Sequence, residues 1–287
     1  TYDDHQCSSY DVEACSWSNI PDEDFALADD NHWTIGQFVW TGFDYLGEPS
    51  PYDTNAWPNH SSMFGIIDLA SIPKDRYYLY RSVWNKNAET LHVLPHWTWP
   101  GREGKVTPVF VYTNHPTAEL FINGKSYGKQ SKNNSSLKNR YRLMWMDAVY
   151  EPGEIKVVAY NKDGKAVAEK IVRTAGKPHH IELVSNRNEL TADGKDLAYI
   201  TVKVVDKDGN LCPADSRQIN FSVKGAGKYR AAANGDPTNL EQFHLPKMHA
   251  FNGMLTAIVQ SGETAGEIVL TAKASGVKAG NIRIQTK

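Results

Sequence analysis

The sequence is poor in cysteine, has no long apolar run and carries almost no net charge. Its three cysteines, Cys7, Cys15 and Cys212, show no spacing typical of a metal site. An odd number excludes a complete disulfide framework, although Cys7 could pair with Cys15 or stay a free thiol. We therefore expect no metal and no cofactor from these residues.

No apolar stretch approaches the ~20 residues that cross a bilayer, and no basic start followed by an apolar stretch marks a signal peptide. The 31 basic and 33 acidic residues give a net charge of −2, which argues against nucleic-acid binding. Hydrophobic residues at 40% predict a folded chain of two or three domains. Because the chain begins without methionine, we expect a mature, trimmed or excised chain.

Several catalytic motifs are also missing: a glycine-rich phosphate loop, a GxSxG elbow and an HExxH helix. Aromatic residues are plentiful, with 8 Trp, 14 Tyr and 9 Phe. Such rings fill protein cores, and they also stack on the apolar faces of sugars.

Residues 1–87 have a mixed α/β pattern. Pro21 followed by three acidic residues predicts a helix that runs to about His32. The apolar run 35–41 is typical of a parallel strand buried on both faces, and the loop 42–71 and a helix from Pro73 follow. This pattern fits the end of a βα barrel and is too short to close an eight-stranded one.

From about Thr90 the helical pattern disappears, and short alternating segments predict strands. Asn123-Gly124 and Asp163-Gly164 are hairpin signals, and 175–178 has the composition of a linker. The strand spacing predicts two β-sandwich modules, 88–175 and 176–287. The expected strands are 91–94, 108–112, 118–122, 143–150, 155–160, 181–184, 197–205, 219–223, 255–259 and 268–272.

The candidate site is the run FVWTGFDYLGEP at 38–49, where a predicted strand enters an acidic, aromatic loop. In βα barrels this end of a strand faces the substrate, so Trp40 could stack on a sugar or plug the barrel top. Acid–base chemistry needs paired carboxylates, but spacing alone places none of the nearby acids in a pair. Those acids are Glu13, Asp44, Glu48 and Asp53.

Three runs resemble the last strand and helix of the catalytic barrel of glycoside hydrolase family 2, especially the multidomain β-galactosidases of gut Bacteroidetes. They are 38–49, WPNHSSMFGIID at 57–68 and PKDRYY at 73–78. The similarity continues through 95–101 and the two β modules. Its motifs there are 111–114, 118–128, 153–160, 190–198 and 234–236.

The resemblance implies a mainly β chain: the C-terminal remnant of a TIM (β/α)8 barrel in 1–87, then two immunoglobulin-like β-sandwiches. It also implies hydrolysis of terminal β-galactosides with retention by two Glu residues, neither of whose motifs occurs here. Glu13 lies in polar loop sequence and is not assigned as the nucleophile. The chain alone is therefore expected to be inactive, and its partners are a β-galactoside and the N-terminal catalytic part.

Trp40 matches the family's tryptophan that closes the sugar subsite, and Asp44, Glu48 and Trp57 are expected beside it. Phe64 stands where well-known members have an Asn near a sodium ion, so no sodium site is transferred. The resemblance implies a bacterial enzyme that is periplasmic, on the cell surface or secreted.

Two alternatives stay open. The chain could be a non-catalytic carbohydrate-binding or adhesion module, with Trp97 and Trp99, or Tyr229 near Asn234, stacking on sugar. The sandwiches could also be spacers, and deletion of 176–287 would then change stability or substrate-size preference more than turnover of a small aryl galactoside.

Overall fold

The structure, a computed structural model, describes residues 8–49 and 59–287. Its contacts divide the chain into two compact units, 1–42 with 73–174 and 43–72 with 175–287. Both units are mainly β, as the sequence predicts. Residues 88–174 lie in the first unit and 175–287 in the second, while the first 87 residues are shared between the units.

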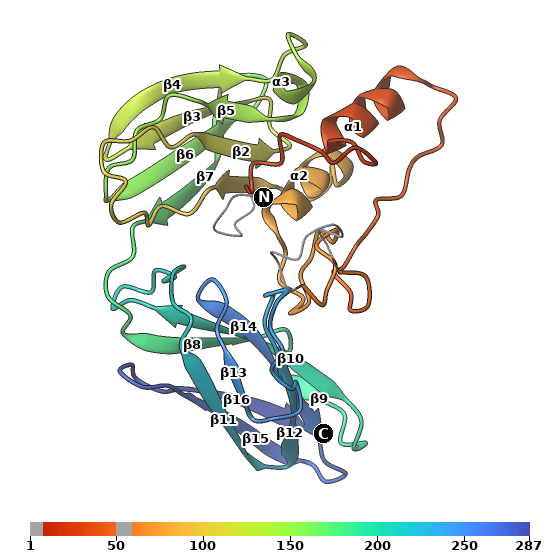
Figure 1. Cartoon of the computed structure of the whole chain (residues 1–287), viewed down its shortest axis with the longest axis vertical. Helices are drawn as coiled ribbons and strands as arrows, with labels where there is room; N and C mark the ends of the chain where they lie inside the picture. Colours follow the sequence, from red (N-terminus) through yellow and green to blue (C-terminus); the bar gives the residue numbers. More distant parts are fainter. Residues whose placement is uncertain (1–7, 50–58) are drawn as a thin grey trace. The chain divides into compact units, whose positions relative to one another are not determined.

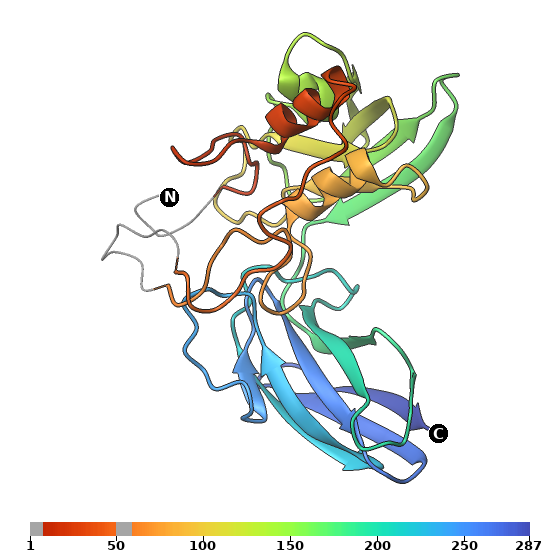
Figure 2. The ribbon, with the colours of Figure 1, turned by 90° about the vertical axis from the view of Figure 1, so that its right-hand side faces the viewer.

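The first unit contains the helices α1 (Pro21–Asp30), α2 (Asp75–Trp84) and α3 (Leu137–Tyr141), so both predicted helices are confirmed. Proline and three acidic residues in the first turn of α1 favour its start. Helix α1 lies beside α3, and α2 lies against β1 and β2 (Figure 2).

Two antiparallel sheets complete the first unit (Figure 1). The three-stranded sheet contains β1 (Leu91–Leu94), β2 (Val109–Thr113) and β5 (Leu143–Trp145), in that order. The four-stranded sheet has the order β4 (Lys125–Ser131), β3 (Thr117–Ile122), β6 (Glu154–Tyr160) and β7 (Ala166–Arg173). Alternate residues of β3 and β6 are buried, and they share one core with the buried face of the smaller sheet.

The second unit also has two sheets around one core. One sheet has the order β12 (Gly227–Ala233), β14 (Met254–Ser261), β10 (Leu197–Val205) and β8 (His180–Ser185). The other has the order β13 (Lys247–His249), β11 (Gln218–Gly225), β15 (Gly266–Lys273), β16 (Gly280–Thr286) and β9 (Glu189–Leu190). Neighbouring strands are antiparallel except β16 and β9.

Every predicted strand of the two modules is present, although β5 ends at Trp145 and does not reach residue 150. The predicted turn between β3 and β4 is confirmed, since Asn123 and Gly124 have φ of 48° and 80°. The sequence missed β4, β7, β9, β12, β13 and β16. Strands β4 and β7 are mostly exposed, so they lack the apolar alternation on which the predictions depended.

The predicted buried strand at 35–41 is wrong for this chain. Residues 34–41 form no strand, and the side chains of Ile35 and Phe38 are fully exposed. A strand needs a neighbour for its backbone hydrogen bonds, and no described segment pairs with this one. Its apolar composition nevertheless remains that of a buried element.

Among the described residues, no helix has the length and apolar character needed to cross a bilayer. Cys15 is exposed and Cys212 is buried. Cys7 lies outside the described residues, so its pairing with Cys15 stays a prediction.

Candidate functional site

Trp40 ends the extended apolar segment of the first unit. Its indole is 74% exposed in this chain. The peptide bond between Trp40 and Thr41 is cis. Exposed indole rings stack on apolar surfaces such as the faces of sugars.

Asp44 and Glu48 lie on the loop that opens the second unit. Asp44 is buried, and its Oδ1 accepts a hydrogen bond of 2.8 Å from the backbone N–H of Gly65. The Asp44 N–H donates to the carbonyl of Ile67 at 2.9 Å. Asp44 therefore joins the two halves of the loop region.

Gly65 is required by this close approach. A Cβ at position 65 would lie 2.2 Å from the Asp44 nitrogen and 2.6 Å from the Ile67 oxygen, and both atoms belong to the backbone. Backbone atoms cannot move out of the way of such a clash as the end of a flexible side chain could, so the loop around Asp44 depends on glycine here.

Glu48 is half-buried, and its carboxylate accepts a hydrogen bond from the Tyr45 hydroxyl. Tyr45 is itself held by Ser62, since its N–H donates to Ser62 Oγ at 3.0 Å and its carbonyl accepts from the Ser62 N–H at 2.9 Å. Ser61 and Ser62 are fully buried. The sequence analysis missed these two serines, although short polar residues before the apolar run 63–67 were a signal for backbone support.

Trp57 and Asp53 lie outside the described residues, so their predicted roles are not tested. Trp40 belongs to the first unit, and Asp44 and Glu48 belong to the second. Glu13 is exposed, as expected for a loop residue. Within the described ranges, no group of three His, Cys, Asp or Glu side chains could hold a metal ion.

The C-terminal β module holds the second half of the loop region, residues 59–72. His60 N–H donates to the carbonyl of Pro237 at 3.0 Å, and Thr256 Oγ1 donates to the buried carbonyl of Ala70 at 2.6 Å. Asp68 packs on Gly235, where a Cβ would come within 2.0 Å of its carboxylate. The Asn-Gly-Asp motif at 234–236 therefore supports the candidate site from the C-terminal module.

The aromatic residues of the alternative binding module have partners within the chain; Trp97 is buried, and Trp99 and Tyr229 are half-buried. Trp97 is fully buried, and its Nε1 donates to the Glu151 carbonyl at 2.9 Å, so the prediction that it stacks on sugar is wrong. Trp99 stacks on His96 at 4.1 Å between ring centroids. The hydroxyl of Tyr229 donates to the Leu245 carbonyl at 2.6 Å.

Two family models match the chain. Residues 181–283 match the model described as glycoside hydrolase family 2 C-terminal domain 5. Residues 104–168 match a domain of unknown function, DUF4982. A β-galactosidase of Bacteroides ovatus is 43% identical over 282 residues, 98% of this chain and 32% of the relative.

The chain belongs to glycoside hydrolase family 2. It spans about a third of the curated β-galactosidase it matches. A β-glucuronidase of Formosa agariphila is 25% identical over 90% of this chain and 26% of its own length. Among solved structures, a β-glycosidase from Bacteroides vulgatus superposes with a TM-score of 0.87 and 34% identity, over 97% of this chain and 34% of its own.

Proposed function

We propose that this chain is the C-terminal part of a retaining β-galactosidase and supplies one wall of its sugar site. The observation that carries this proposal is the 43% identity with a β-galactosidase, which extends over 98% of the chain and so includes the candidate loops. A β-glucuronidase is a more distant relative, so glucuronic acid is the competing sugar.

In this proposal the segment 35–41 is the last strand of a (β/α)8 barrel whose neighbouring strands lie outside this chain. The full exposure of Ile35 and Phe38 supports it, because exposed apolar side chains that cluster in one segment mark a surface that another part of a protein covers. Trp40 then reaches the substrate face of the barrel, at the carboxyl end of its strand.

Trp40 stacks on the galactose ring in the assembled enzyme, and Glu48 and Trp57 lie beside it. Asp44 contributes by holding the loop that carries Glu48, through its bond to Gly65. The C-terminal β module keeps that loop in place through residues 235–237 and Thr256. Both β modules have immunoglobulin-like topology in this proposal. Such an enzyme acts in the periplasm, at the cell surface or outside the cell.

Both catalytic Glu residues lie outside this chain in the proposal, so the chain alone has no glycosidase activity. The test is hydrolysis of an aryl β-galactoside and an aryl β-glucuronide by the purified 287-residue chain, with intact mass measured to exclude longer species. We expect no turnover of either substrate. Turnover that Glu13→Gln abolishes would contradict the proposal and make Glu13 a catalytic residue.

A chimera tests the second part of the proposal, that the chain contributes to the sugar site of an assembled β-galactosidase. This chain would replace the matching C-terminal third of the Bacteroides ovatus β-galactosidase, and kcat/KM would be measured with both aryl substrates. We expect hydrolysis of the galactoside, and a loss of roughly tenfold or more in kcat/KM for Trp40→Ala. Tyr199→Ala is the matched control, because Tyr199 is an exposed aromatic residue on β10. Equal loss in both variants would argue against stacking by Trp40.

A further inference from the structure

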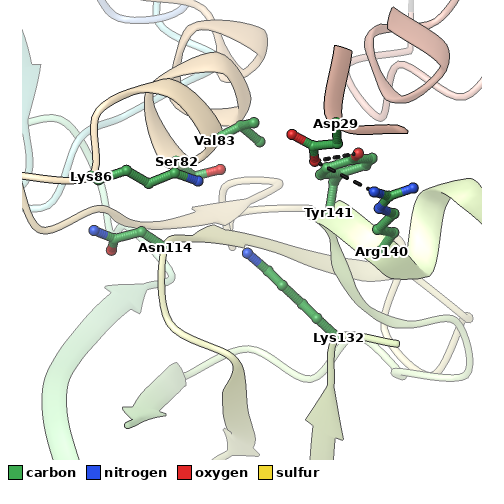
Figure 3. Close-up of a pocket in the computed structure, with 8 residues that line it drawn as sticks. All are labelled: Asp29, Ser82, Val83, Lys86, Asn114, Lys132, Arg140 and Tyr141. Carbon is green, nitrogen blue, oxygen red and sulfur yellow. Dashed lines mark hydrogen bonds and ion pairs between the residues drawn. The ribbon is translucent and has the colours of Figure 1, made fainter. Parts of the chain in front are cut away.

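A cavity of about 270 Å³ lies in the first unit, and none of the candidate sugar-site residues lines it. Three helices and two strand ends of the unit contribute to it, and Figure 3 shows the lining side chains. They are Asp29, Ser82, Val83, Lys86, Asn114, Lys132, Arg140 and Tyr141. The cavity is at the small end of the range for ligand pockets, so it fits one small group.

The neutral polar groups of this cavity already have partners. The Ser82 hydroxyl donates to the Leu79 carbonyl at 2.8 Å. The Asn114 amide donates to the Ala88 carbonyl at 3.1 Å, and its oxygen accepts from the Thr90 N–H at 3.1 Å. These side chains therefore have little left to offer a neutral ligand.

The guanidinium on one side of the cavity is already paired with two carboxylates. Arg140 makes two hydrogen bonds to Asp30, of 2.9 and 2.8 Å, and lies 3.7 Å from Asp29. The Tyr141 hydroxyl donates to Asp29 Oδ2 at 2.9 Å. The dashed lines of Figure 3 mark the contacts that Asp29 makes with Arg140 and Tyr141.

The ammonium groups of Lys132 and Lys86 are the charged groups of the cavity that have not yet been assigned a partner. The Lys132 side chain points into the cavity, where its ammonium donates to the Thr113 carbonyl (Figure 3). Lys86 lies beyond the end of α2 and is exposed. Within the part of the chain that the structure describes, neither lysine has an ion-pair partner. A desolvated ammonium next to a second positive charge is unfavourable unless an anion binds.

We propose that this cavity binds a small oxyanion, the carboxylate or sulfate group of a ligand no larger than one acidic monosaccharide. The ammonium groups of Lys132 and Lys86 hold the anion, while Arg140 stays paired with Asp29 and Asp30. The site lies partly in the segment 104–168, which matches a domain of unknown function. It does not depend on whether the chain belongs to an active hydrolase.

Binding by this site depends on pH in a defined direction. Burial, assisted by the charge of Lys86, lowers the pKa of Lys132 to about 8. The other titratable groups that line the cavity are Asp29 on α1 and Arg140 and Tyr141 on α3. A bound anion favours the charged lysine, so binding takes up a proton near pH 8. Affinity therefore falls roughly tenfold between pH 7 and pH 9.

The experiment is calorimetric titration of the 287-residue chain with sulfate, with galacturonate and with galactose as the neutral control. Titrations at pH 8 in two buffers of different ionisation enthalpy measure proton uptake. We expect saturable binding of the anions, proton uptake and no binding of galactose. Tighter binding of galacturonate than sulfate would identify an acidic sugar as the source of the anion, and equal affinity would identify a free inorganic anion.

Lys132→Met is the decisive variant, and Lys162→Gln, in an exposed turn, is its matched control. We expect at least a tenfold loss of anion affinity in Lys132→Met and none in Lys162→Gln. Thermal unfolding shows that the variant is folded, and its Tm at pH 7 should rise, because an uncompensated charge has been removed. Unchanged anion affinity in Lys132→Met, or absence of saturable binding to the unmodified chain, would overturn the proposal.

Discussion

The ion pair of Asp22 and Arg142 connects helix α1 to the β module of the first unit. Both side chains are completely buried. Arg142 Nε donates to Asp22 Oδ1 at 2.9 Å, and Nη2 donates to Oδ2. Its Nη1 donates to the Tyr10 carbonyl at 2.7 Å. Burial opposes the charge of Arg142, but the hydrogen bonds to Asp22 and the nearby negative charges of Asp22 and Asp11 together outweigh it and raise the pKa of Arg142.

Asp22→Asn keeps the shape of this side chain and removes its charge. The guanidinium then stays buried without a counter-ion, a change that costs about 3–5 kcal/mol of unfolding free energy. Urea unfolding followed by tryptophan emission measures this loss in the correct unit, because seven of the eight tryptophans lie in the ranges 1–42 and 73–174. The eighth is Trp57.

The same helix provides the control. Asp30 also pairs with an arginine, Arg140, but this pair is exposed, so Asp30→Asn should change stability by no more than the error of the measurement. The double variant Asp22→Asn/Arg142→Met should be less destabilised than the sum of its single variants. A loss below about 1 kcal/mol in Asp22→Asn would refute the argument, because it would mean that water or another group compensates the charge.

Three other predictions concern single positions. Burial would raise the pKa of Asp206, but hydrogen bonds from the Asn210 side chain and three backbone N–H groups outweigh it and lower the pKa to about 2. The second unit should therefore lose about 2 kcal/mol of stability as pH falls from about 4 to 2, measured by urea unfolding followed by circular dichroism, and Asp206→Asn should remove this dependence. Gly65→Ala should destabilise by about 1–3 kcal/mol in the same assay, whereas Gly42→Ala, with nothing near its Cβ, should not. Lys132→Met should stabilise the first unit by up to about 3 kcal/mol at pH 7, and the gain should vanish as pH rises from 8 to 10.5.

Residue alternation and turn residues predicted the β modules, because interactions between neighbouring residues specify those strands and turns. The buried positions of β3 and β6 alternate strictly, and Asn123-Gly124 adopts the positive φ values that the hairpin needs. Strands β4 and β7 were not predicted because most of their residues are exposed. Hydrogen bonding to the partner strands β3 and β6, and not an apolar pattern, specifies them.

The segment 35–41 shows the opposite failure. Its apolar composition is that of a segment buried in a core. Among the described residues, however, no strand pairs with it. Sequence could place Trp40, Asp44 and Glu48 on adjacent parts of the chain. It could not place Ser62 or Gly65 against them, because hydrogen bonds across 17 and 21 residues leave no local pattern.

The support of residues 59–72 by the C-terminal module leads to a prediction about the spacer interpretation. Pro237 and Thr256 bind the backbone of His60 and Ala70, and the same loop region holds Asp44 through Gly65. Deletion of 176–287 from the active chimera removes these partners, so turnover of a small aryl galactoside should fall along with stability. Thr256→Val is the milder test, because it leaves the buried Ala70 carbonyl without its donor at nearly constant volume. If deletion changed only the preference for large substrates, the module would be a spacer and the loop contacts would not matter for catalysis.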